Sequence, residues 1–193
     1  YISGYTAGSL GGTNAGNNDA FLTKYDGLGN ILWSRQIGTS SNDYGRAMAV
    51  DGSGNAYISG YTSGTLGGTS AGGVDAFLTK YDSWGNVLWS RQIGTSGGDY
   101  SYSVAVDDSG HAYISGATDG SFGEVVAGRA HAFLVKYNSL GNILWSREIG
   151  SSGYDYSNSV AVDDSGHAYI SGYTTSSLGG PSLGLIDAFL VKY

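Results

Sequence analysis

Hydrophobic residues along this chain occur in short runs or at every second position, which is the pattern of β-strands rather than of helices. Within residues 95–150, four apolar segments are separated by three connections. Two of these connections, 107–111 and 138–142, are rich in Asp, Asn, Ser and Gly, which bond the local backbone or supply a positive φ. The pattern predicts four strands in an antiparallel meander, at residues 103–106, 112–116, 132–137 and 143–149.

This meander pattern recurs every 56 residues without insertion or deletion. The run Tyr-Ile-Ser-Gly starts at Tyr1, Tyr57, Tyr113 and Tyr169, and Leu-Trp-Ser-Arg starts at Leu32, Leu88 and Leu144. A repeated four-stranded unit of this size predicts the blades of an all-β β-propeller. A β-solenoid is the main alternative, but its coils are usually shorter and do not need hairpin turns.

The chain holds about three and a half of these units. We expect two four-stranded blades, 39–94 and 95–150, between two three-stranded blades, 1–38 and 151–193, as part of a longer propeller. Open blade edges present unpaired backbone groups, so we expect self-association or protein binding there. A head-to-tail dimer, a four-bladed ring and an open filament all remain possible arrangements.

The composition fits many short strands joined by tight turns, because 34 glycines and 16 tyrosines accompany a single proline. The net charge of −7 repels phosphate backbones, so nucleic acid is not an expected partner. The absence of cysteine excludes disulfides and thiolate metal sites. No apolar run approaches the roughly 18 to 20 residues that span a bilayer, so membrane insertion is not expected.

Several runs that recur in each unit resemble the SBBP family of bacterial β-propeller repeats. They are Asp-Ala-Phe-Leu-Thr-Lys-Tyr-Asp, Gly-Asn-x-Leu-Trp-Ser-Arg-Gln-Ile-Gly, Val-Ala-Val-Asp-x-Ser-Gly and Tyr-Ile-Ser-Gly-Tyr-Thr. The resemblance covers essentially the whole chain and implies a propeller in a secreted or surface-exposed protein, without implying a chemistry. The turn from Tyr25 to Trp33 is also similar to the tryptophan docking motif of quinoprotein propellers, although it is one residue shorter. That similarity implies that the fourth strand of each unit is outermost and the first is innermost.

Residues that recur in every copy are predicted to be structural. We expect the tryptophans of the fourth strand to pack between neighbouring blades and the phenylalanines of the third strand to fill the core. These residues are Trp33, Trp89 and Trp145, and Phe21, Phe77, Phe133 and Phe189. We expect the repeated aspartates to cap backbone amides in turns and loops, and the lysine and arginine of each unit to pair with loop aspartates. These aspartates are Asp43, Asp51, Asp99, Asp107, Asp155 and Asp163.

The segment Asp51-Gly52-Ser53-Gly54-Asn55 has oxygen donors at alternate positions, as calcium loops do. It lacks a further acidic ligand, and histidine replaces Asn55 in the next two copies, so calcium is the weaker interpretation and we expect no metal or cofactor. The histidines are expected to be turn residues. No nucleophile elbow, phosphate loop or zinc-protease motif is present, and we expect no enzymatic activity.

Departures from the repeat are the best candidates for ligand or partner contact, because propellers commonly bind through loops of one face. The third copy departs most in the loop between its second and third strands, where neutral drift is the alternative. Its candidate residues are Phe122, Glu124, Val125, Val126, Arg129 and His131. The same loop of the last copy contributes the apolar residues Leu183, Leu185 and Ile186.

The sequence therefore predicts a non-catalytic extracellular or cell-surface module that binds proteins or assembles with itself. The alternative is a glycan-binding propeller that uses Trp, Tyr and loop Asp or Asn.

Overall fold

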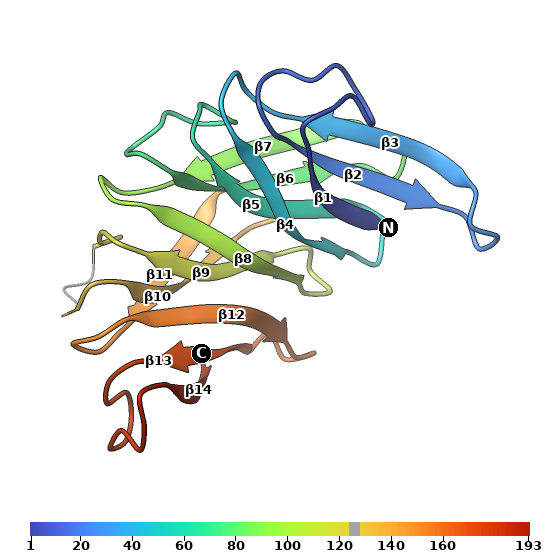
Figure 1. Ribbon diagram of the computed structural model, residues 1–193. Coiled ribbons are helices and arrows are strands. Elements are labelled where there is room, and N and C mark those ends of the chain that lie inside the picture. Colours follow the sequence, from blue (N-terminus) through green and yellow to red (C-terminus); the bar gives the residue numbers. More distant parts are fainter. Residues whose placement is uncertain (124–127) are drawn as a thin grey trace.

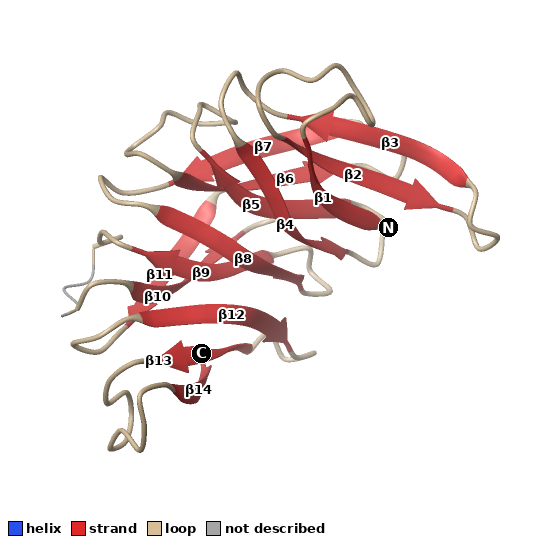
Figure 2. Cartoon of the chain, viewed as in Figure 1, coloured by secondary structure: helices blue, strands red, loops and turns tan. Residues whose placement is uncertain are grey.

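A computed structural model describes residues 1–123 and 128–193, and these residues form fourteen strands and no helix (Figure 2). The first sheet contains β1 (Ile2–Thr6), β2 (Asp19–Tyr25) and β3 (Ile31–Ile37). The second contains β4 (Asp43–Val50), β5 (Ala56–Thr62), β6 (Asp75–Tyr81) and β7 (Val87–Ile93). The third contains β8 (Asp99–Val106), β9 (Ala112–Thr118), β10 (His131–Tyr137) and β11 (Ile143–Ile149). The fourth contains β12 (Asp155–Val162), β13 (Ala168–Thr174) and β14 (Asp187–Lys192).

Each sheet is an antiparallel meander whose strands pair in chain order. The four sheets follow one another from the N-terminal sheet to the C-terminal sheet, and they do not close into a ring (Figure 1). This arrangement confirms the all-β fold of propeller-type blades, with two four-stranded units between two three-stranded ones. The described residues contain no helix long and apolar enough to cross a membrane.

The hydrophobic core lies between neighbouring sheets. Successive residues of a strand point to opposite faces, so Phe77 of β6 packs with Leu22 of the first sheet, while Leu78 packs with Ile114 of the third. The same alternation places Phe133 of β10 against the second sheet. Phe77 and Phe133 are fully buried, which confirms the core role predicted for them.

The first strand of each blade is innermost, as predicted, because β4 contacts β8 and β8 contacts β12 across the blade boundaries. Each of these strands contains a β-bulge at which the pairing register skips one residue. The skipped residues are Arg46, Tyr102 and Asn158. A bulge leaves its extra residue outside the hydrogen-bonded ladder and redirects the side chain.

The turn between the two outer strands depends on a glycine that serves two blades. Gly85 has φ = +83°, a conformation that residues with a Cβ rarely adopt. A Cβ at this position would also come within 2.9 Å of the Trp33 ring in the preceding blade. Gly141 repeats both features, with φ = +79° and the Trp89 ring at 2.8 Å.

Candidate functional site

The repeated tryptophan and arginine of the outer strands β3 and β7 hold adjacent blades together. Trp33 donates its indole N–H to the carbonyl of Ser83 at 3.1 Å, in the outer turn of the next blade. Arg35 donates through Nε to the carbonyl of Gly85 at 2.7 Å in the same turn. Because the next interface repeats this contact, we call it the forward clamp. The predicted packing of Trp33 between blades is therefore confirmed.

The second forward clamp joins Trp89 to Ser139 at 3.0 Å and Arg91 to Gly141 at 2.8 Å. The expected pairing of these arginines with loop aspartates is wrong, because the planar guanidinium bonds to carbonyl oxygens of a tight turn. Two of the lysines pair as predicted: Lys80 lies 3.7 Å from Asp51, and Lys136 lies 4.0 Å from Asp107.

The aspartates that follow the inner strands cap the turns, as expected. The Asp51 carboxylate accepts the amides of Ser53 at 3.0 Å and Asn55 at 2.9 Å. In the last copy, partial desolvation raises the pKa of Asp163, but the amide and imidazole of His167 and the Tyr169 hydroxyl outweigh it, so that the pKa falls to about 2. The protein's own donors thus surround these carboxylates. The part of the chain that the structure describes contains no group of three or more acidic, His or Cys side chains that could hold a metal ion.

The aspartates that begin the inner strands also cap amides. Asp43 accepts the Thr39 amide at 2.6 Å, and Asp99 accepts the Thr95 amide at the same distance. At Asp99, burial dominates over the hydrogen bonds and raises the pKa of the carboxyl group.

A second repeated contact links the third strand to the outer strand in the first and second copies. Gln92 donates its side-chain amide to Asp75 at 2.7 Å and to the carbonyl of Gly64 at 3.0 Å. The Gln92 side-chain oxygen accepts the Leu66 amide at 2.7 Å. One glutamine therefore fastens the long loop of the blade to its outer strand.

In the third copy, two coupled substitutions replace this contact. His131 stands where the other copies have Asp, and Glu148 stands where the preceding copies have Gln. The two side chains are buried and face each other, with His131 Nδ1 3.7 Å from Glu148 Oε2, and Glu148 accepts the Phe122 amide. Both substitutions occur in the same copy, so the sequence carried a signal for Glu148 as well, although only His131 was among the predicted contact residues.

The loop of the third copy is thus partly interior. The Phe122 ring packs edge-on against Phe133 at a centroid distance of 5.3 Å, and His131 is only 6% exposed. Arg129 is exposed and donates to the Tyr154 hydroxyl at 3.2 Å. The candidate residues Glu124, Val125 and Val126 lie outside the described residues. Arg129 is therefore the described candidate of this loop that presents its side chain on the rim, and its role in partner contact stays a prediction.

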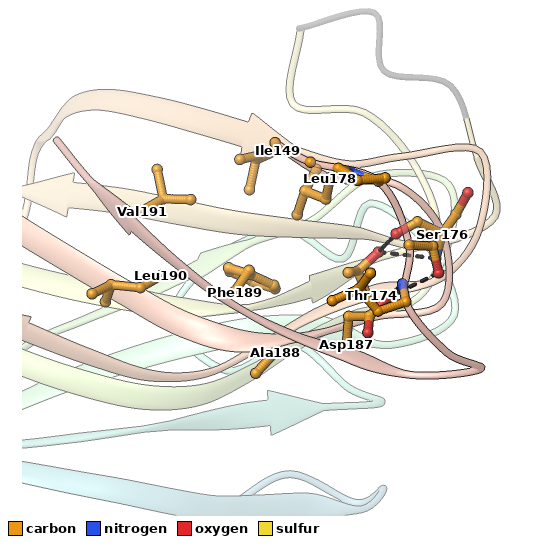
Figure 3. Close-up of a pocket in the computed structure, with 14 residues that line it drawn as sticks. Ile149, Thr174, Ser176, Leu178, Asp187, Ala188, Phe189, Leu190 and Val191 are labelled. Carbon is orange, nitrogen blue, oxygen red and sulfur yellow. Dashed lines mark hydrogen bonds between the residues drawn. The ribbon is translucent and has the colours of Figure 1, made fainter.

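The corresponding loop of the last copy borders a groove along β14. Its candidate residues are exposed, at 90% for Leu183, 92% for Leu185 and 64% for Ile186. The groove has a volume of about 580 Å³, and we call it the β14 groove. Figure 3 shows Phe189 and Val191 along its length with Asp187 at one end.

A second hollow lies on the inner strands and was not predicted. It has a volume of about 430 Å³ and is lined by Arg46, Tyr102, Tyr156, Asn158 and Tyr173. Since three of these are the bulge residues of β4, β8 and β12, we call it the bulge hollow. The signal in the sequence is a single position at which three otherwise similar strands carry Arg, Tyr and Asn.

Fold and interfaces define this molecule as a β-propeller-type repeat array. The model of the SBBP beta-propeller repeat matches the chain three times, at residues 32–68, 88–123 and 144–179, which together make up more than half of it. The chain belongs to this family.

Two curated proteins are similar to the chain. One is an uncharacterized WD repeat-containing protein of Acanthamoeba polyphaga mimivirus, 25% identical over 184 residues, a match that covers 74% of this chain and 13% of the relative. The other is Regulatory protein FlaEY of Caulobacter vibrioides, 28% identical over 167 residues, covering 78% of this chain and 18% of the relative. The chain therefore spans less than a fifth of either relative.

Among solved structures, a protein of unknown function from Bacteroides caccae is similar with a TM-score of 0.44 and 12% identity. The match covers 79% of this chain and 46% of that one.

Proposed function

We propose that this chain is a non-catalytic scaffold that binds protein by accepting an added strand along β14. The single observation that carries the proposal is the β14 groove, whose walls carry the positions that the outer strand contacts in the second blade. Its occupant is an outer strand of this same repeat type, carried by another copy of the repeat.

The fit of that occupant follows from the repeat. In the second blade, Gln92 of the outer strand contacts Gly64, Leu66 and Asp75. The residues one hundred and twelve positions later are Ser176, Leu178 and Asp187, and all three line the β14 groove. The groove thus carries the same three receptor positions for a glutamine side chain.

The floor of the groove suits an apolar strand face. Phe189, Val191, Leu178 and Ile149 form one hydrophobic cluster there. Among the described residues, no strand pairs with the outer edge of β14. An added strand would pair with the backbone groups of that edge. Main-chain hydrogen bonds supply affinity in this mode of recognition, and side-chain pockets supply specificity.

The test uses a fluorescent peptide with the sequence of residues 86–95, Asn-Val-Leu-Trp-Ser-Arg-Gln-Ile-Gly-Thr. We expect saturable binding to the chain by fluorescence anisotropy, weakened at least about tenfold when the peptide carries Gln92→Leu, because the Asp187 carboxylate then loses its donor. The variant Asp187→Ala should weaken binding similarly. The matched variant Asp75→Ala lies in a blade that already has its outer strand and should bind the peptide normally.

An anisotropy that stays flat up to about 1 mM peptide would refute strand capture, as would equal binding of the Gln92→Leu peptide. Size-exclusion chromatography with light scattering tests the assembly form of the proposal. A mass that rises with protein concentration supports association between copies, and a strict monomer at high concentration contradicts it.

The proposed location is extracellular or at the cell surface, which the family resemblance supports. Protease treatment of intact cells that express the full-length gene tests it, since a surface protein should be cleaved and an internal one protected.

The proposed absence of catalysis is supported by the roles of the repeated aspartates, which cap turns, and of the arginines of the forward clamps, which bond backbone carbonyls. The glycan alternative loses two of its aromatic candidates, because Trp33 and Trp89 bond to the next blade. The exposed Trp84 and the tyrosines remain as candidates for saccharide contact.

A further inference from the structure

The three inner strands differ most sharply at the residue where each one bulges. Their sequences are Asp-Tyr-Gly-Arg-Ala-Met-Ala-Val, Asp-Tyr-Ser-Tyr-Ser-Val-Ala-Val and Asp-Tyr-Ser-Asn-Ser-Val-Ala-Val. The first two and last two positions are identical in all copies. The bulge position carries Arg46, Tyr102 and Asn158, three polar groups of different chemistry. The backbone conformation at this point is therefore common to the three strands, whereas the side chain differs and can serve a role other than folding.

The bulge residues of three different blades converge on one hollow. Together with Tyr156 and Tyr173 they line the bulge hollow of about 430 Å³, which is within the range of roughly 300–1,000 Å³ typical of small-molecule sites. The rings of Tyr156 and Tyr173 stack with their centroids 5.1 Å apart. Bulges of this kind often redirect a side chain next to a binding site.

The aromatic lining continues beyond the hollow. Tyr100 stacks on Tyr102 at 6.4 Å and contacts Tyr61 at 5.1 Å, and the Arg46 guanidinium lies 5.7 Å from the centre of the Tyr61 ring. Tyrosine rings of this kind offer apolar surface together with polar hydroxyl tips.

The polar groups of the hollow are free to bond a ligand. Within residues 1–123 and 128–193, Arg46, Asn158 and the hydroxyl of Tyr102 make no hydrogen bond or ion pair to the protein, whereas Arg35 and Arg91 are fully used in the forward clamps. Burial and the neighbouring Tyr156 raise the pKa of Tyr102 to about 12, so this hydroxyl remains a donor at neutral pH.

We propose that the bulge hollow binds an acidic saccharide with a single carboxylate. Arg46 pairs with the carboxylate, the tyrosine rings pack against the sugar, and Asn158 and the Tyr102 hydroxyl bond to sugar hydroxyls. A planar guanidinium matches a carboxylate with two parallel hydrogen bonds. Asp119, whose negative charge acts on Tyr100 and Tyr156, opposes a second anionic group on the ligand.

This proposal goes beyond the scaffold role and does not depend on it, because the bulge hollow and the β14 groove share no lining residue. The probe is 3′-sialyllactose, with lactose as its neutral counterpart and acetate as a carboxylate without a sugar. Binding is measured by chemical-shift perturbation in NMR spectra of the whole chain. We expect shifts at Tyr102, Tyr156 and Asn158 with sialyllactose, and at least about tenfold weaker binding of lactose and of acetate.

Substitutions then locate the carboxylate. Arg46→Gln should weaken sialyllactose binding about tenfold or more. Arg46→Lys should retain part of the affinity, because lysine keeps the positive charge but cannot form the two parallel hydrogen bonds of a guanidinium. Arg46 is exposed, so both variants should unfold at the same temperature as the parent chain. The matched variant Arg129→Gln removes an exposed arginine that does not line the hollow and should leave binding unchanged.

Three results would overturn the proposal: no shifts at millimolar sialyllactose, equal binding of lactose or acetate, or unchanged affinity in Arg46→Gln. Arg46→Gln should also bind the outer-strand peptide normally, so a failure of the saccharide site and a failure of strand capture can be told apart.

Discussion

The coupled pair His131 and Glu148 makes a prediction that the neighbouring blade can check. Each single substitution back to the common repeat residue should lower the free energy of unfolding or leave it unchanged. The double substitution should restore the lost stability. His131→Asp alone places a second carboxylate beside Glu148 at a site where the side chains of His131 and Glu148 are 8% and 0% exposed. One of the two must then bind a proton at neutral pH, and a pKa shift of about 2 to 3 units corresponds to about 3–4 kcal/mol of lost stability.

Glu148→Gln alone should lower the free energy of unfolding by no more than about 1 kcal/mol. A glutamine at this position still accepts the loop amide, as Gln92 does from Leu66 at 2.7 Å. The double variant rebuilds the contact between Gln92 and Asp75, which measures 2.7 Å in the preceding blade. We therefore expect a favourable coupling energy of about 2–4 kcal/mol between the two substitutions.

The assay is urea unfolding at neutral pH, followed by the fluorescence of the interface tryptophans. The reverse substitutions can be made in the second blade. Gln92→Glu should destabilise the protein because the new carboxylate lies beside Asp75, and adding Asp75→His should restore the lost stability. Additive effects within about 0.5 kcal/mol in either blade would show that the two positions are independent and that the substitutions are unrelated drift.

Three further predictions concern the interfaces and turns. Arg91→Met should lower the free energy of unfolding by about 2–3 kcal/mol in urea titration, because two charge-assisted hydrogen bonds to Gly141 and Leu140 are lost; an effect below about 0.5 kcal/mol would contradict the forward clamp. Gly85→Ala should cost at least about 1–2 kcal/mol because of its positive φ, while Gly52→Ala, which has open space around it, should be close to neutral in the same assay; equal losses would be inconsistent with this account. The pKa values of Asp51, Asp107 and Asp163 are lowered in the folded state. These carboxylates therefore stabilise the fold fully above the unfolded pKa of 3.8. Their contribution disappears as the pH falls through the folded pKa values, which is about 2 for Asp163. The melting temperature should therefore fall between about pH 4 and pH 2, and Asp163→Asn should flatten that fall; a midpoint that is constant across this window would argue against the turn caps.

The blades and their strand order were predictable because they rest on local signals. Alternating apolar residues and turns such as 107–111 repeat often enough to fix the unit, and the capping aspartates act within four residues of their own position. The forward clamps were only half predictable. Trp33 and Arg35 stand out in the sequence, but their acceptors are backbone carbonyls, which leave no signature in the identity of the accepting residue.

The two hollows could be predicted only in part from the sequence, for a different reason. The bulge hollow is lined by Arg46, Tyr102 and Asn158 from three blades, and the sequence of a single strand does not predict the bulge. The β14 groove depends on the path of the loop before Asp187, which a Gly-rich segment does not specify.

The forward clamps also give the array a direction and a tolerance for change. The first and second blades each donate to the outer turn of the blade that follows. The acceptors are main-chain oxygens, whether the turn carries Trp84 in one copy or Leu140 in the next. The contact between neighbouring units therefore depends on the backbone conformation of the turn and not on the identity of its side chains. A duplicated, deleted or transplanted 56-residue unit would meet the same acceptors at its new boundary, so copy number can change in evolution without the interface having to be reinvented.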